Sequence, residues 1–394
     1  MDTIDRKGQT TAPETVPTVE IKAPVPFTEK ELIAITTPRQ LMWWKFRRHR
    51  VAVFSAVVLI IFYVVALFAS FISPYDPNEF DASYKFVQPM LLSFKNANGD
   101  FSLRPGVHGL IPNRDPETLR ITYEIDKSTW YPLHFFVKSN PYKLFGFIES
   151  DIHLFGLGEE AGDLPVFLLG SDRLGRDMFS RVLYGARISL SIGLVSVFLS
   201  LTLGIVLGGI SGYYGGAVDN IIQRMIEFIR SIPTLPLWMA LSAALPADWS
   251  QEWRYFGITI ILSAIAWTGL GRQVRGRFLA LRTEDFVLAA RLSGARDRRI
   301  ILRHMVPSFT SHIIASLTLS IPGIILAETA LSFLGLGLRQ PVISWGVLLQ
   351  EAQNVRTVAL APWLLLPGLA VVITVLAFNF LGDGLRDAAD PFSH

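Results

Sequence analysis

One apolar run near the amino-terminal end constrains this chain more than any other feature. Residues 51–73 are almost uninterruptedly apolar. As a helix this run of about 23 residues is roughly 35 Å long, enough to cross a hydrocarbon core of about 30 Å. Directly before it lie Trp43, Trp44 and the basic segment 45–50. Tryptophans followed by basic residues are typical of the interface between membrane and water. The sequence therefore predicts a membrane anchor that starts in the cytoplasm and emerges outside after Ser73.

The composition agrees with a protein that crosses the membrane several times. Of the 394 residues, 51% are hydrophobic and only 18% are charged, whereas ordinary soluble domains carry about 25% charged residues. The net charge of +3 gives no reason to expect nucleic acid as a partner. The chain has no cysteine, which excludes disulfides, thiolate metal sites and cysteine nucleophiles.

Five further apolar stretches predict an all-α bundle of six membrane-spanning helices. They lie at about 188–210, 231–247, 255–271, 308–327 and 362–381. The stretch 231–247 is the weakest, because three prolines interrupt it and it must borrow length from a helix at 219–230. Six spans place both termini in the cytoplasm. The nine arginines between 272 and 303 then lie in a cytoplasmic loop, as the positive-inside rule requires.

The spans divide the chain into four parts. Residues 1–37 are polar, lack apolar periodicity and predict a flexible cytoplasmic tail. Residues 38–73 are predicted to form an interfacial helix and the first span, and residues 169–392 to hold the other five spans. The long segment between them, 74–168, is predicted to be an external insertion. Its alternating apolar residues at 121–125 and 133–137 predict β-structure.

The arginine-rich loop contains a predicted short helix at 283–294. Thr283 suits the N-cap, acidic residues follow in the first turn, and Gly294 suits the position after the helix. Phe286, Ala289, Ala290 and Ser293 share one face, and their mostly small side chains allow close approach to another protein. The spacing alone is equally compatible with an ordinary surface helix whose flanking arginines only fix the topology.

Residues 284–294 and 300–307 resemble the EAA loop of ATP-binding-cassette (ABC) importer permeases. In that family the loop is the coupling helix that docks into the ATPase subunit. The resemblance implies that the coupling residues here are Phe286, Ala289, Ala290, Arg291, Ser293, Gly294 and Pro307. One departure is Leu288, which stands where the glutamate that names the loop would fall. Glu284 and Asp285 are the candidate substitutes for that glutamate.

Further segments resemble the C-type membrane subunit of dipeptide, oligopeptide and nickel importers. They are 169–181 with 184–189, 212–216 with 231–234, and 327–337 with 381–387. The resemblance covers about 40–78 and 168–392 and implies six transmembrane helices of the type I importer permease fold in a bacterial inner membrane. The implied partners are a homologous B-type permease, two P-loop ATPases, an extracytoplasmic binding protein and membrane lipid. The insertion lies outside the resemblance.

The chain is not expected to be an enzyme by itself or to hold a cofactor. No Gly-Lys-Ser/Thr sequence occurs in it, so it lacks the loop that cradles ATP phosphates. ATP and magnesium are therefore expected on the partner ATPases. The seven histidines show no paired spacing, and no metal site is predicted.

Four charged residues outside the loop are candidate receptor or gating contacts. Arg173, Arg176 and Asp177 either grip a binding protein or belong to a structural ion-pair cluster at the entrance of the second span. Glu328, at the outer end of the fifth span, either lines a polar path or lies at the water interface, which we favour slightly. The sequence does not choose between the roles of the first three.

These observations predict a permease subunit that forms half of a translocation pathway for peptides or similar small solutes. The alternative is a secondary transporter driven by an ion gradient, which requires charged or broken-helix ion sites at mid-membrane and usually inverted repeats. The spans show no mid-span carboxylate and no repeat. A membrane-bound enzyme would need a catalytic constellation, and none is apparent. The substrate itself, whether peptide, opine, oligosaccharide or nickel chelate, is not readable from the sequence.

Overall fold

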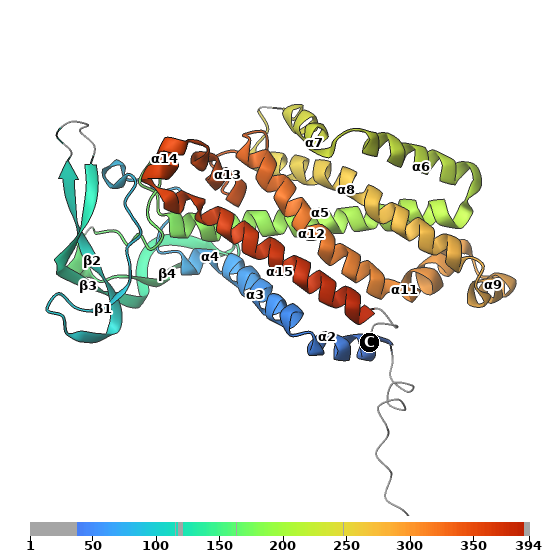
Figure 1. Ribbon diagram of the computed structural model, residues 1–394, viewed down its shortest axis with the longest axis horizontal. Helices are drawn as coiled ribbons and strands as arrows, with labels where there is room; N and C mark the ends of the chain where they lie inside the picture. Colours follow the sequence, from blue (N-terminus) through green and yellow to red (C-terminus); the bar gives the residue numbers. More distant parts are fainter. Residues whose placement is uncertain (1–37, 115, 117–120, 163, 247, 390–394) are drawn as a thin grey trace, which may run out of the picture. The chain divides into compact units, whose positions relative to one another are not determined.

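The computed structural model describes residues 38–114, 116, 121–162, 164–246 and 248–389. The tail predicted for 1–37 lies outside these residues. The described residues from Met42 onward belong to one compact unit. This unit combines long helices with one antiparallel sheet (Figure 1).

Within the described residues, five helical segments are long and apolar enough to cross a membrane. They are α3 (Arg50–Leu67), α5 (Met178–Tyr214), α8 (Gln251–Leu281), α12 (Thr310–Phe333) and the segment Pro362–Ala389, which is mostly α15 (Leu366–Ala389). Five of the six predicted spans are therefore confirmed as long apolar helices. The basic segment before the first span includes His49, whose side chain caps α3 by accepting a hydrogen bond from the Ala52 N–H (3.1 Å).

The third predicted span, 231–247, is not one helix. It contains only the ten-residue helix α7 (Thr234–Ala243), which follows α6 (Gly216–Ser231). The break lies at Ile232 and Pro233, because a residue before proline disfavours the helical conformation. Figure 1 shows α6 and α7 one after the other along α8, and each contacts α8. The stretch is therefore a broken pair of helices, and the helix predicted at 219–230 to lengthen it corresponds to α6, which begins at Gly216.

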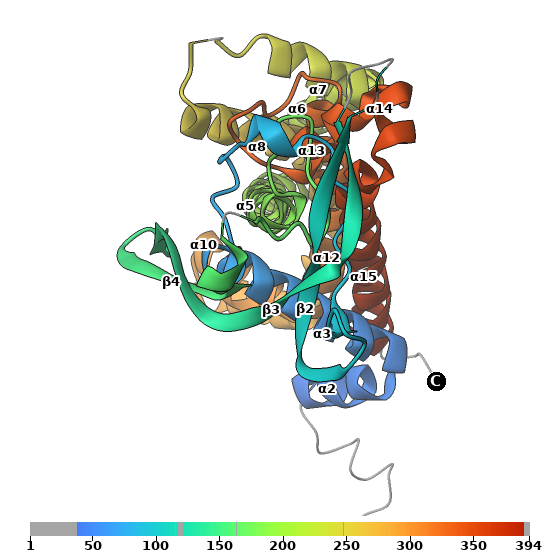
Figure 2. The same cartoon turned by 90° about the vertical axis from the view of Figure 1, so that its left-hand side faces the viewer.

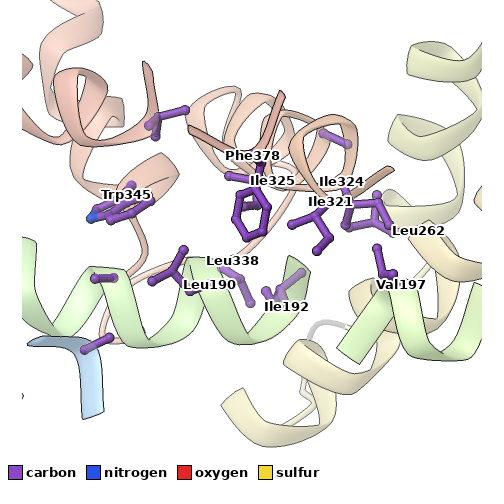
Figure 3. Packing of buried hydrophobic residues seen from close by; sticks show 14 of the residues in the cluster. Leu190, Ile192, Val197, Leu262, Ile321, Ile324, Ile325, Leu338, Trp345 and Phe378 are labelled. Atoms are coloured by element: carbon purple, nitrogen blue, oxygen red, sulfur yellow. The ribbon is translucent and has the colours of Figure 1, made fainter. Parts of the chain in front are cut away.

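The helices pack around a large apolar cluster and through small residues. Figure 3 shows part of that cluster, in which side chains of α5, α8, α12 and α15 meet, with Trp345 at one end. The most extensive helix contact joins α5 and α8. A Cβ atom added to Gly208 of α5 would lie 2.4 Å from the Gly271 carbonyl oxygen of α8. Glycine at this crossing therefore permits close approach of the two backbones.

Replacing Gly208 with alanine is expected to destabilise the bundle. The added methyl group overlaps backbone atoms that have no rotamer freedom, and such overpacking costs about 1–3 kcal/mol. Gly269→Ala on α8 is the matched control, because an added Cβ there meets nothing within 4 Å. Thermal unfolding in detergent should show a lower midpoint for Gly208→Ala alone; equal midpoints would contradict this account of the crossing.

The insertion contains a four-stranded antiparallel sheet in its described part, which confirms the predicted β-structure. The strands are β1 (Ser93–Lys95), β2 (Phe101–Arg114), β3 (Ile121–Leu144) and β4 (Ile148–Leu157), in the order β1-β2-β3-β4. The long strand β3 pairs with β2 through its first part and with β4 through its second part. Both alternating stretches of the sequence lie in β3. The sheet is at one end of the helices (Figures 1 and 2).

Short helices complete the structure at both ends of the bundle. Near the first span they are α2 (Pro38–Arg48), α4 (Ala69–Ile72) and η1 (Ala82–Tyr84), and η2 (Glu159–Ala161) follows β4. At the end away from the sheet they are α9 (Asp285–Leu292), α10 (Asp297–Arg299), η3 (Ile300–Met305) and α11 (Val306–Ser308). Between α12 and α15 they are α13 (Trp345–Gln350), η4 (Glu351–Gln353), α14 (Val355–Leu360) and η5 (Pro362–Leu365).

Candidate functional site

The short helix predicted at 283–294 is present as α9, at the opposite end of the bundle from the sheet (Figure 1). Its N-cap position is Glu284 and not Thr283, whose hydroxyl donates to the Ala280 carbonyl at the end of α8 (3.0 Å). Gly294 follows the helix with φ +78°, a left-handed conformation that favours glycine. The helix therefore starts two residues later than predicted and ends close to the predicted position.

One face of α9 is packed against the bundle. Val287 is fully buried in an apolar cluster with Phe278 of α8, Ile300 and Met305, and Ala290 is partly buried against the same cluster. Val287 and Ala290 lie three residues apart and so share one side of the helix. The prediction that Ala290 belongs to the outward docking face was therefore wrong, because its methyl group helps to attach α9 to the bundle.

The opposite face of α9 is exposed and more apolar than predicted. Phe286, Ala289 and Ser293 are exposed, as a docking face requires. Leu288 and Leu292 are exposed as well, and 89% of the Leu292 surface is free. Sequence reasoning did not select Leu292, although its spacing of four residues from Leu288 places both on one side of a helix.

The exposed Arg291 side chain contacts the bundle through Tyr213. Its guanidinium donates a hydrogen bond to the Tyr213 hydroxyl (3.3 Å) and lies 5.6 Å from that ring. The hydrogen bond to Tyr213 raises the pKa of Arg291. Tyr213, near the end of α5, in turn donates to the Asp297 carboxylate of α10 (2.7 Å). Tyr213 and Asp297 were both missed as positioning residues, and they fix α9 and α10 to α5.

Pro307 lies where the loop leads into the fifth long helix. It is an exposed residue of α11, directly after the π-helix η3, in which the Val306 N–H bonds to the Ile301 carbonyl. A proline has no N–H to continue a regular helical ladder, and such interruptions mark distorted helix junctions. Pro307 therefore belongs to the connection between α9 and α12, not to the exposed face of α9.

At the sheet end, two of the three residues of the predicted charged cluster, Arg176 and Asp177, are buried. The Arg176 guanidinium bonds the Asp172 carboxylate (2.6 Å) and the Glu351 carboxylate (3.0 Å). Asp177 caps α5 by accepting from the Ser180 N–H (2.8 Å), and burial raises its pKa to about 6. Burial also raises the pKa of Glu351, and the neighbouring Asp172 charge adds to that effect.

The exposure of each residue decides between the two roles considered for the cluster, contact with a binding protein or a structural ion-pair network. Arg176 and Asp177 are inside the fold, where Arg176 joins the start of α5 to Glu351 of η4 and Asp177 caps α5, and a binding protein cannot reach them. Arg173 differs, since 59% of its side-chain surface is exposed and its Nε is 3.8 Å from Glu351. Of the three predicted residues, Arg173 is thus the candidate for contact with another protein.

Replacing Arg176 with alanine should destabilise the sheet end of the bundle. The Asp172 and Glu351 carboxylates would lose their shared partner in a buried site, a loss that typically costs about 3–5 kcal/mol. Arg173→Ala is the control, because an exposed pair contributes at most about 1 kcal/mol. The midpoint of thermal unfolding measures both effects, and a larger loss for Arg173→Ala would contradict the proposed network.

Glu328 is fully buried, so its predicted place at the water interface was wrong. Its carboxylate accepts hydrogen bonds from Ser332 (2.8 Å), Ser344 (2.7 Å) and Ser189 (3.3 Å). Each of these hydroxyls also accepts a backbone N–H: Leu338 on Ser332, Val347 on Ser344 and Trp345 on Ser189. Glu328 therefore orients Ser189 and Ser332, which hold the segment 338–347 on the bundle, and binds Ser344 of that segment directly.

Comparisons with known proteins decide what kind of protein carries this geometry. Residues 204–393 match the model of the family described as binding-protein-dependent transport system inner membrane component. Residues 37–90 match the N-terminal TM domain of oligopeptide transport permease C. The oligopeptide transport system permease protein OppC of Haemophilus influenzae is 42% identical over 223 residues, which cover 56% of this chain and 69% of that protein. This chain belongs to the binding-protein-dependent permease family.

Other relatives agree with this assignment. The glutathione transport system permease protein GsiD of Escherichia coli is 33% identical over 362 residues, 91% of each chain. A solved structure of the MetNI methionine ABC transporter, inward facing, is similar over 54% of this chain and 97% of that chain, with 18% identity and a TM-score of 0.42. The family matches and the sequence relatives, not this structural likeness, identify the permease as a multi-pass membrane component of an ABC importer, without enzymatic activity of its own. The alternative of a secondary transporter is not supported.

Proposed function

We propose that this permease forms one half of the translocation pathway of an importer for short peptides. The substrate class is supported by relatives named for oligopeptide, dipeptide and glutathione transport. In this proposal a homologous B-type permease forms the other half, and an extracytoplasmic binding protein delivers the substrate at the sheet end. Two P-loop ATPases bind ATP and magnesium, and one of them docks on α9.

The exposed apolar face of α9 is the observation that supports ATPase docking at this place. Leu288 and Leu292 are unpartnered at the end of the bundle that carries the arginine-rich segment. An exposed apolar helix face of this kind suits insertion into a groove of another protein. The arginines around it favour a cytoplasmic position for this end, where ATPases have access to ATP.

The contacts of α9 provide a route by which ATPase movement reaches the membrane helices. Val287 joins α9 to Phe278 of α8, and Arg291 joins it to Tyr213 of α5. α5 and α8 form the most extensive helix pair, so a displacement of α9 acts on both helices together. Closure of the two ATPases would therefore rock the pair and alternate access to the pathway.

Uptake by the reconstituted transporter tests this proposal. Proteoliposomes that contain this permease and its partners should take up radiolabelled peptides only when ATP is present on the ATPase side. A protonophore should leave the uptake intact, because no ion gradient drives it. Uptake without ATP that the protonophore abolishes would overturn the proposal, and uptake of other solutes but not peptides would overturn the substrate class.

We also propose a bacterial inner-membrane location with both termini in the cytoplasm. Because the chain has no cysteine, single cysteines at Asn98, in the insertion, and at Arg298, in α10, report the topology without background. A membrane-impermeant maleimide should label Asn98→Cys in intact spheroplasts, but Arg298→Cys only after permeabilisation. The reverse pattern would show that the topology is inverted.

A further inference from the structure

The tip of the β3–β4 hairpin has two chemically different faces. In this tip, residues 142–149, Leu144 pairs with Ile148 and Lys143 pairs with Glu149. Because successive residues of a strand point to opposite sides, the first pair and the second pair lie on opposite faces. Phe145 and Phe147 in the turn add to the exposed apolar surface, and 76% of the Phe147 surface is free. The Lys143 ammonium and the Glu149 carboxylate, 3.4 Å apart, are both exposed.

Contacts with the first span fix the depth of this hairpin. The Phe145 ring lies 5.5 Å from that of Phe68, directly after α3, and the Phe136 ring of β3 lies 6.2 Å from that of Phe71 in α4. In addition, the buried His153 ring of β4 hydrogen-bonds the Ser73 carbonyl through Nδ1. The hairpin is thus attached to the outer end of the first span.

The position of that end along the membrane normal follows from helix geometry. α3 has 18 residues and therefore a length of about 27 Å, close to the thickness of about 30 Å of the hydrocarbon core. Phe68 and the ring of Phe145 beside it lie where hydrocarbon gives way to headgroups. Figure 2 shows that the hairpin extends to one side, beyond α5. The tip therefore lies over the bilayer surrounding the helices instead of over the centre of the bundle.

We infer that the hairpin tip is a lipid-binding surface that lies in the outer headgroup layer. Phe145, Phe147 and Ile148 enter the upper acyl region, and Lys143 and Glu149 face water. The apolar surface of the tip continues that of α3, whose exposed residues include Phe54 and Leu67. A paired hairpin satisfies most of its backbone groups, so shallow immersion leaves few unpaired N–H and C=O groups in an apolar phase.

This arrangement gives the insertion a second attachment to the membrane, independent of the transported solute. The first attachment is the chain itself, through α3 and α5. With the tip held by lipid, the remainder of the sheet keeps a fixed orientation above the bundle. The inference requires only that α3 spans the bilayer, so its test does not depend on the proposed substrate or on the ATPases.

Depth measurement with spin labels tests the inference on the full chain. Single cysteines at Phe147 and Ile148 probe the apolar face, Glu149→Cys probes the opposite face, and Leu103→Cys on β2 is an exposed apolar control away from the tip. The labelled chains are placed in nanodiscs of phosphatidylcholine and phosphatidylglycerol. Collision rates are then measured with oxygen, which concentrates in lipid, and with a water-soluble nickel chelate.

The ratio of oxygen to nickel collision rates should be several-fold higher at 147 and 148 than at 149 and 103. Equal ratios at all four sites would show that the tip is in water and would overturn the inference. Protection of 147 and 148 from both reagents would also overturn it, because protein and not lipid would then cover the tip. The substituted side chains at 147 and 149 are mostly exposed, so folding should be retained, and circular dichroism of each variant checks this.

Discussion

Glutamate in place of Leu292 should abolish transport while the chain remains folded and inserted. Leu292 is the most exposed large apolar side chain of α9, with 89% of its surface free, so the substitution disturbs no contact within the chain. In the assembled importer the same position enters the ATPase groove under our proposal. Burying an unpaired carboxylate there costs several kcal/mol, enough to release the helix from the groove. Uptake and co-purification of the ATPases should therefore fall together.

Two further glutamate substitutions on α9 serve as controls for this prediction. Leu288→Glu places the same charge one turn earlier, at the position where the family's EAA loop carries glutamate, and should reduce transport much less. Ala290→Glu places the charge on the bundle side, against the cluster of Val287 and Phe278, and should lower stability as well as transport. Full transport by Leu292→Glu, with the ATPases still bound, would show that this face of α9 is not the docking surface.

The need for these controls follows from what the sequence could and could not specify about α9. Acidic residues, Gly294 and the EAA resemblance identified the helix and its end correctly. The spacing showed which side chains share a face, but two faces of a short helix can both be apolar, and Ala290 was assigned to the wrong one. Burial of Val287 depends on Phe278 and Met305, which come from α8 and η3, and no local pattern encodes such a contact.

In the rest of the fold, too, local sequence patterns predicted the elements but not the contacts between distant residues. Long apolar runs predicted five spans because membrane thickness fixes helix length. The apolar stretch of α7 was predicted to borrow length from a separate helix at 219–230, because Pro233 interrupts the apolar signal and α6 is amphipathic, as a surface helix is. Alternation predicted β-structure in the insertion. The attachment of β4 to Ser73 through His153 joins residues 80 positions apart and had no sequence signal.

Glu328 is the residue at which the structure most changes the effect expected from a substitution. An interfacial carboxylate would tolerate leucine, whereas Glu328→Leu in the buried site should strongly destabilise the permease. It leaves the hydroxyls of Ser189, Ser332 and Ser344 without their common acceptor, and each unsatisfied buried group costs about 1–3 kcal/mol. The hydroxyls of Ser189 and Ser332 also hold the segment 338–347, and Ser344 of that segment binds Glu328 directly, so that segment should loosen first.

Glu328→Gln is the matched control, because one amide oxygen can replace the carboxylate oxygen Oε1 that accepts from both Ser332 and Ser344. Its amide nitrogen then faces Ser189, whose hydroxyl is able to accept a hydrogen bond. Thermal unfolding in detergent should therefore give a midpoint near that of the natural chain for glutamine and a much lower midpoint for leucine. Equal losses for both variants would mean that the negative charge, and not the acceptor geometry, holds the serines. No loss for either would mean that the three serines find other acceptors, as serine does in helices by bonding the carbonyl four residues earlier.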